Sequence, residues 1–569
     1  MKDGPTIRLP QSTYRGLLLT ADADRPGLPK AVEAFRGIPY ARIATPEGRF
    51  RPASPVPPGT KSFDATRHGP LCPTFASSMD EAEGWGVSED CLNADIFRPV
   101  TDSGADLKLP VVVYVHGGGF NFGKGAERDM ASFVGHASRD IVAVTFNYRL
   151  GPLGFLSSGV GESEGCLNLG LRDQRALLEW VKDNIHAFGG DAENVTVMGV
   201  SAGAHSIGHH MLSADPARLL FHKAILESGA STARSVLAPT HERQESQFRD
   251  FLSSCSISLQ LTPEETVEQL QAMPLKSILD AAAAVWVPNQ NSLRWPFQPV
   301  IDGQGGIIPD IPVHRTTSSP PSGALIPVIT GFNSHEGAIF LAETKASTPE
   351  DFNAFFKTLI PGLSAADLER LAALYPDPAD APSDAYLPRP PGTSPQFCRL
   401  AAAYADQAYV APVLLTAHRN AQAGTPVYVY EFAARGEPFA AANHGSEGDV
   451  VARDVKSLGA HDGLVDVSEM MHGLFSRFVA SPVGEDSLVF SSHEATGTHW
   501  PRFISPFAEG ALPEAGEVLV FGQGNDERAG GRSRGTPTSV RRLSSLEIER
   551  CRFWWEKMPL SQGMGTDGK

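Results

Sequence analysis

The fold of this chain is decided by the stretch Val195-Thr196-Val197-Met198-Gly199-Val200-Ser201-Ala202-Gly203. Its apolar start predicts a buried strand, and the residues from 204 onwards predict a helix. Between the two lies Gly-x-Ser-x-Gly, the pattern of a nucleophile elbow, in which the serine is strained and only glycine fits on either side. The turn raises the hydroxyl above a helix N-terminus, which stabilises negative charge. We therefore predict that Ser201 is a nucleophile.

Short apolar runs alternate with helical patterns along the chain, which is typical of an α/β fold with a large, mostly parallel central sheet flanked by helices. The predicted strands are Val111–Val115, Ile141–Phe146, Val195–Met198, Ala224–Leu226, Ile326–Thr330, Val427–Phe432 and Val518–Phe521. Leu169–Phe188 has apolar residues at helical spacing and ends at a pair of glycines, so it predicts a helix between two of these strands.

Other segments predict additions to this central sheet. The first hundred residues read as a small antiparallel sheet, with Tyr14–Thr20 and Ala34–Tyr40 as strands. Helical segments at Glu242–Ala284 and Asp351–Tyr375 are expected to roof a pocket. We predict a single domain over residues 1–569, with a core at about 10–525 and a C-terminal extension at about 526–569. The arginines from Arg528 to Arg542 stand among Gly, Ser and Thr, so that segment is expected to be a solvated loop.

Composition excludes several classes of partner. The chain has 569 residues, with 48 Lys and Arg against 65 Asp and Glu, a formal charge of −17, and no basic cluster that would bind nucleic acid or an anionic membrane. No apolar run is long enough for a transmembrane segment, and no apolar signal follows Met1, so we expect a cytoplasmic location. The six cysteines show no metal-type spacing, and we predict neither a metal nor a cofactor.

His116-Gly117-Gly118-Gly119-Phe120 follows the predicted strand Val111–Val115. Consecutive glycines let backbone N–H groups approach a ligand without interference from side chains. An HGGG loop and the amide after a nucleophilic serine form the oxyanion hole of lipases and esterases. We therefore predict that the N–H groups of Gly118, Gly119 and Ala202 bind the oxyanion of an acyl-transfer intermediate.

Several ordered segments together resemble the type-B carboxylesterase/lipase family, which includes the cholinesterases. They are Phe35-Arg36-Gly37-Ile38-Pro39-Tyr40-Ala41, Ser88-Glu89-Asp90-Cys91-Leu92-Asn93, residues 116–120, Asn147-Tyr148-Arg149-Leu150-Gly151, residues 168–174, the elbow, Pro299-Val300-Ile301-Asp302-Gly303 and residues 331–337. The likeness covers about residues 10–525 and is closest to fungal members. It implies an α/β-hydrolase fold and a Ser–Glu–His triad in that chain order. Glu336, in Ser334-His335-Glu336-Gly337, matches the acid.

Two histidines compete for the third position of the triad. His444, in His444-Gly445-Ser446-Glu447, resembles the family motif, and His461 is its rival. In the family a helix follows the histidine at roughly thirty residues. His444 stands 28 residues before His472 on the predicted helix Val467–Val479, whereas His461 stands only 11 before it. We therefore prefer His444.

Other positions bear on specificity. The resemblance implies a disulfide between Cys72 and Cys91. In a cytosol these two cysteines would stay reduced, as free thiols. Many family members carry glutamate before the nucleophile, where this chain has Val200, so the charge that attracts a cationic substrate is missing. Trp85 could stack on a cation, but a lone indole on a loop is more often a packing residue. Choline esters are therefore disfavoured.

These observations favour a serine carboxylesterase that hydrolyses a neutral, moderately apolar, small-molecule ester through an acyl-enzyme. An acyl transferase that tailors a secondary metabolite would use the same residues, because the acceptor is chosen by the pocket. A non-catalytic binding protein of the same family is the third possibility, and its members usually lack the serine that Ser201 supplies here.

Overall fold

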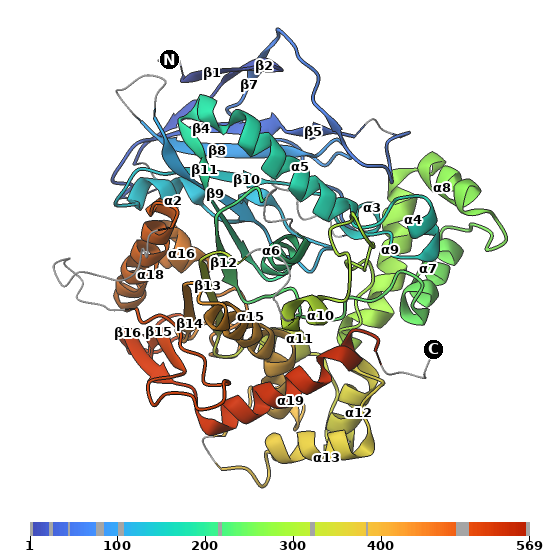
Figure 1. Ribbon diagram of the computed structural model, residues 1–569, viewed down its shortest axis with the longest axis vertical. Helices are drawn as coiled ribbons and strands as arrows, with labels where there is room; N and C mark the ends of the chain where they lie inside the picture. The colour runs from blue at the N-terminus through green and yellow to red at the C-terminus, as the bar shows by residue number, and fades with distance from the viewer. Residues whose placement is uncertain are drawn as a thin grey trace.

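A large twisted sheet runs through the molecule (Figure 1). The computed structural model describes residues 4–21, 25, 27–43, 46–75, 85–100, 107–213, 219–318, 325–382, 385–484 and 500–564. Within these residues, eleven strands pair in the order β16-β15-β14-β13-β12-β11-β9-β10-β8-β4-β3. The interior strands are parallel from β15 to β10, and the pairs at both ends of the sheet are antiparallel.

All seven strands predicted from apolar runs lie in this sheet. They are β9 (Leu109–Val115), β10 (Val142–Phe146), β11 (Gly190–Val200), β12 (Lys223–Glu227), β13 (Val328–Asn333), β14 (Val427–Phe432) and β15 (Glu517–Gln523). The predicted helix at 169–188 is α5 (Leu169–Asn184) followed by a 3-10 turn, Ile185–Phe188. Strands buried on both faces are continuously apolar, which is why their sequence signal was strong.

The small N-terminal sheet consists of β1 (Thr6–Leu9), β2 (Ser12–Arg15) and β7 (Ser62–Asp64). β1 and β2 are antiparallel, whereas β2 and β7 are parallel. The segment predicted as Ala34–Tyr40 differs from expectation, because β4 (Val32–Pro39) belongs to the large sheet, between β3 (Leu17–Leu19) and β8 (Asn93–Pro99). Val32, Ala34, Phe35 and Ile38 are fully buried, and only the large sheet offers that much cover.

Alternate residues of each strand face two different hydrophobic cores. In β9, Val111 and Val113 pack on the side covered by α5, α6 (Ala202–Ser213) and α15 (Ala411–Gln422), while Val112 and Tyr114 pack on the opposite side. That second side is covered by α2 (Met130–His136) and α18 (Asp462–Ala480), at the left of the sheet in Figure 1. Helices on both faces hold the strand ends, and any residues that follow them, in fixed positions.

Inserted helices surround the sheet where the sequence predicted them. The set at the right of Figure 1 is α7 (Glu242–Ser254), α8 (Pro263–Ala272) and α9 (Leu275–Asn289), and α12 (Pro349–Leu359) and α13 (Ala365–Leu374) lie at the bottom. Trp286 of α9 has its ring 5.1 Å from the rings of both Phe122 and Trp295. Phe122 and Trp295 line the cavity described below, so α9 supports its wall from behind, whereas none of the lining residues belongs to α7, α8, α12 or α13.

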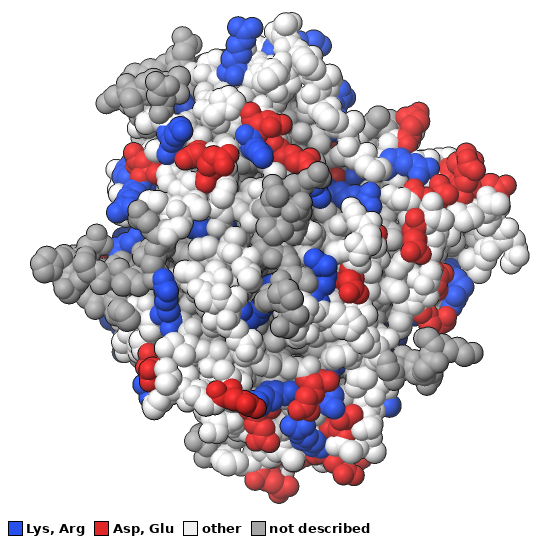
Figure 2. Space-filling model, in the orientation of Figure 1, with Lys and Arg blue, Asp and Glu red and all other residues white. Residues whose placement is uncertain are grey.

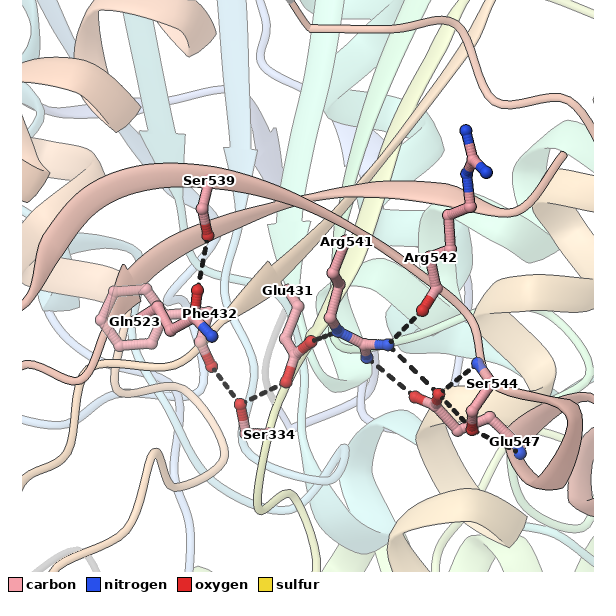
Figure 3. A network of polar contacts seen from close by, with 9 residues as sticks. All are labelled: Ser334, Glu431, Phe432, Gln523, Ser539, Arg541, Arg542, Ser544 and Glu547. Atoms are coloured by element: carbon pink, nitrogen blue, oxygen red, sulfur yellow. Dashed lines mark hydrogen bonds and ion pairs between the residues drawn. The ribbon is translucent and has the colours of Figure 1, made fainter. Parts of the chain in front are cut away.

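The segment expected to be a solvated loop, Arg528 to Arg542, is an irregular and largely exposed stretch only as far as residue 535. Residues Thr536–Arg542 form β16, antiparallel to β15, and α19 (Ser545–Ser561) follows. Arg541 donates from Nε to Glu431 of β14 at 2.5 Å and from Nη2 to Glu547 of α19 at 2.8 Å (Figure 3). Glu431 also accepts from Ser334 Oγ. For residues 536–542 the expectation was wrong, because the strand pairing with β15 and the contact with Glu431, 110 residues away, leave no mark on the local sequence.

Lys and Arg are interspersed with Asp and Glu on the face of the molecule in Figure 2, and acidic side chains gather at its right, over α8. Among the described residues, no helix combines the length and the apolar character needed to cross a bilayer.

Candidate active site

Ser201 occupies the tight turn between β11 and α6 that the sequence predicted. Its φ of 56° is left-handed, a conformation that costs a non-glycine residue roughly 1–2 kcal/mol. A Cβ on Gly203 would lie 2.1 Å from the carbonyl oxygen of Val115, and one on Gly199 would lie 2.8 Å from the same oxygen. Only glycine fits at either position, so the pentapeptide pattern has a steric cause.

The glycine loop follows β9 and lies beside the serine. Gly118 and Gly119 have φ values of 102° and 60°, and a Cβ on Gly118 would lie 2.2 Å from the carbonyl oxygen of Phe122. Both glycines line the same cavity as Ser201, and Ala202 is fully buried at the start of α6. Within the described residues, the N–H groups of Gly118, Gly119 and Ala202 donate to no protein acceptor, which leaves them available to a ligand oxygen.

The carboxylate and the imidazole meet in a single hydrogen bond. Glu336 follows β13 and is fully buried, and its Oε2 lies 2.5 Å from His444 Nδ1. His444 comes from the loop between β14 and α16 (Gly448–Ala452) and lines the same cavity as Ser201. Its Nε2 is buried and has no protein partner among the described residues. The imidazole is therefore held at one nitrogen and available at the other.

The rival histidine lies elsewhere. His461 stands at the N-cap of α18 and does not line the cavity. His335, next to the acid, accepts at Nδ1 from the backbone N–H of Ala442, and a β-bridge pairs it with Asn443. That pairing ties the loop of Glu336 to the loop of His444. The structure thus brings together Ser201, Glu336 and His444, and leaves His461 out.

Two residues that the sequence did not indicate, Ser228 and Asn333, donate hydrogen bonds to the second carboxylate oxygen of Glu336. Oε1 accepts from Ser228 Oγ at 2.5 Å and from the backbone N–H of Asn333 at 2.6 Å. Ser228 directly follows β12, and Asn333 ends β13. The carboxyl ends of parallel strands meet at one edge of a sheet, so a search of residues there could have found both.

A second buried acid, Glu447, lies behind Glu336. It is fully buried and accepts from Asn333 Nδ2 at 2.7 Å. Burial, with the negative charges of Glu227 and Glu336, raises the pKa of Glu447 from 4.5 to about 8. Glu227 differs, because Arg128 donates to both of its oxygens at 2.7 and 2.8 Å. The raised pKa of Glu447 favours its protonated form and so limits the negative charge beside Glu336.

Glu447→Gln is expected to change how stability depends on pH. The folded protein holds a proton on Glu447 that the unfolded chain releases above pH 4.5, so this group makes unfolding progressively easier as pH rises towards about 8. The full slope is about 1.4 kcal/mol per pH unit. Urea unfolding at pH 5 and pH 8 should show a smaller loss of unfolding free energy in the variant than in the wild type. An equal loss in both would contradict the protonated state.

The cavity has a volume of about 430 Å³, and both aromatic and charged side chains line it. Phe122, Trp295 and Phe340 form apolar walls, and Val200 stands next to the serine. Trp85 does not line this cavity: it stacks on His68, and the Lys124 ammonium lies 4.7 Å from its ring. A protein cation thus already occupies the indole that could have bound a substrate cation. The described residues hold no cluster of three or more side chains suited to a metal ion.

Comparisons with known proteins identify the family of this chain. The model of the carboxylesterase family matches residues 3–513. Secreted lipase 4 of Gibberella zeae is 35% identical over 425 residues, which cover 73% of this chain and 74% of the relative. Para-nitrobenzyl esterase of Bacillus subtilis is 35% identical over 387 residues, 67% of this chain and 74% of the relative.

Solved structures give the same answer for the fold. The crystal structure of Aspergillus niger EstA superposes with a TM-score of 0.77 at 26% identity and covers 99% of both chains. A family match over most of the sequence, a relative of 35% identity and a superposition over nearly the whole chain converge on one assignment. The chain belongs to the carboxylesterase family and is an α/β-hydrolase that cleaves carboxylic esters.

Proposed function

We propose that the ester is cleaved through an acyl-enzyme on Ser201, with His444 as general base and Glu336 as its orienting acid. His444 Nε2 takes the proton of the attacking hydroxyl and returns it to the leaving alcohol. His444 then activates a water molecule, which attacks the acyl-enzyme and releases the carboxylic acid. The N–H groups of Gly118, Gly119 and Ala202 bind the oxyanion. The observation that carries this proposal is the 2.5 Å hydrogen bond between His444 and Glu336, in a cavity that Ser201 also lines.

Covalent labelling tests the nucleophile. Phenylmethylsulfonyl fluoride should form one adduct per chain on Ser201, because among the described residues it is the serine that lines the same cavity as the unpartnered Nε2 of His444. Peptide mapping by mass spectrometry locates the adduct, and Ser201→Ala serves as the unlabelled control. An adduct on another serine would overturn the proposal.

Charge discrimination tests the substrate class. We propose that the site prefers neutral, moderately apolar esters to quaternary ammonium esters, because Val200 supplies no negative charge and Lys124 covers Trp85. The expected kcat/KM for S-(3,3-dimethylbutyl) thiobutyrate is at least about tenfold above that for butyrylthiocholine, a difference of 1.4 kcal/mol. The two thioesters have the same shape, so only the charge differs. Equal values would contradict this preference.

The cytoplasmic location remains a prediction, and two observations favour an oxidising compartment instead. Cys72 and Cys91 form a disulfide, as the resemblance implied, and disulfides persist mainly outside the cytosol. One of the similar proteins is named a secreted lipase. Thiol titration of the denatured protein from its native cells separates the two locations, because a cytosolic chain would expose both of these thiols.

A further inference from the structure

Arg234 lies against the aromatic wall of the catalytic cavity. It follows β12 in a left-handed conformation, with a φ of 61°, and its side chain is half-buried. The guanidinium carbon lies 3.9 Å from the ring centre of Trp295 and 5.9 Å from that of Phe340. Both rings line the cavity that contains Ser201. Arg234 is not itself among the residues that line the cavity, so its positive charge lies directly behind these two rings.

The guanidinium has no acidic partner in the described part of the chain. Its hydrogen bonds there are to two neutral phenols, from Nη2 to Tyr404 Oη at 3.0 Å and to Tyr409 Oη at 3.5 Å. A guanidinium carries five N–H donors, and a half-buried cation that has lost part of its hydration is stabilised by an acidic partner. Other charged groups of the cavity are satisfied: Arg128 pairs with Glu227, and Asp449 pairs with Arg528. Arg234 thus keeps donors and charge for a ligand.

Trp295 connects this charge to the oxyanion loop. A Cβ on Gly119 would lie 2.7 Å from Cζ3 of Trp295, so the edge of the indole touches the glycine proposed to bind the oxyanion. The carbonyl whose oxygen enters that hole belongs to the acyl half of the ester. The indole of Trp295 thus contacts both the oxyanion loop and the guanidinium, and a short acyl chain that follows it from Gly119 would be directed towards that charge.

We propose that Arg234 binds a carboxylate at the far end of the acyl group, so that the preferred substrates are monoesters of short dicarboxylic acids. Guanidinium and carboxylate match in shape and charge, and the pair forms two parallel hydrogen bonds. The inference rests on the proposed function and refines its substrate: esters with an anionic acyl group rank above neutral ones, and neutral ones rank above quaternary ammonium esters.

A matched pair of unactivated esters tests the assignment. Monobenzyl glutarate and benzyl pentanoate differ only in a terminal carboxylate or methyl group, and chromatography of benzyl alcohol measures both reactions. The wild type should favour the glutarate ester by about tenfold or more in kcat/KM, the scale of a hydrogen bond to a charged group. In Arg234→Gln this ratio should fall towards one. Arg175→Gln, which changes a solvent-facing arginine of α5, should keep the wild-type ratio.

The outcomes separate this inference from the proposed function. Hydrolysis of benzyl pentanoate without a preference for the glutarate ester overturns the role of Arg234 and leaves the esterase mechanism standing. Failure to cleave either ester, with no labelling of Ser201, overturns the mechanism itself. A third pair, 4-butanoyloxybutanoate and butyl butanoate, differs only by a carboxylate in the alcohol half of the ester. A preference for the charged member of this pair, without the glutarate preference, would mean that the site binds a carboxylate of the alcohol half, and it would also overturn the inference.

If Arg234→Gln does not fold, product inhibition of the wild-type protein gives a second test. The product glutarate should inhibit hydrolysis of benzyl pentanoate more strongly than pentanoate does, since only glutarate offers a second carboxylate to Arg234. Weaker or equal inhibition by glutarate contradicts the assignment.

Discussion

His444→Ala is expected to lower kcat by roughly 10⁴- to 10⁶-fold, because loss of the base removes proton transfer from both half-reactions. Among the described residues, His444 is the one that both hydrogen-bonds the buried Glu336 and lines the cavity of Ser201. Turnover of p-nitrophenyl butanoate measures the loss. A thermal unfolding midpoint close to that of the wild type shows that the fold is retained.

His461→Ala is the matched control for that experiment. His461 stands at the N-cap of α18, and its side chain forms no capping hydrogen bond there. Its replacement should therefore leave kcat within a few-fold of the wild type and cost at most some stability. If the two variants behaved in the opposite way, His461 would be the base, and the hydrogen bond between His444 and Glu336 would have only a structural role.

Glu336→Gln should lower kcat by about 10⁴-fold, the scale found when a triad carboxylate becomes an amide. Glu336 holds His444 at Nδ1 and is itself held by Ser228 and Asn333. An amide of the same shape cannot balance the imidazolium that forms in the transition state. The fold should survive the isosteric change.

Asp302→Asn is the control for the carboxylate. Asp302 accepts from the backbone N–H groups of Ile307 and Ile308, so it supports a turn and does not line the cavity. Its replacement should affect stability more than turnover. Near-normal turnover in Glu336→Gln would mean that another carboxylate orients the base.

Local sequence predicted the parts of the site that have a local cause. At the elbow of Ser201 and in the loop of Gly118 and Gly119, neighbouring atoms leave no room for a Cβ. Only glycine fits at such positions, so the spacing of the glycines in the sequence indicates these turns. Glu336 was predictable only through the family resemblance, because a glutamate after a strand is ordinary. The preference for His444 came from a distance along the chain, and the geometry agrees with it.

The missed features are those created by pairing distant segments. Ser228 and Asn333 reach Glu336 because β12 and β13 are neighbours in the sheet. Arg541 was assigned to a loop because its partners, Glu431 and Glu547, belong to other elements. A sequence pattern describes the environment along one segment, whereas these contacts depend on which strands pair.

The two outer strands of the sheet, β3 and β16, have features that discourage pairing with another copy of the chain. An edge strand offers unpaired backbone groups to any other chain, and short, charged or proline-containing edges discourage such pairing. β3 has only three residues, Leu17–Leu19, and β16 carries Pro537, Arg541 and Arg542. A chain that ended at residue 525 would expose the apolar β15 in its place. The C-terminal strand thus covers the apolar edge of β15, which is the edge on which another copy could otherwise pair.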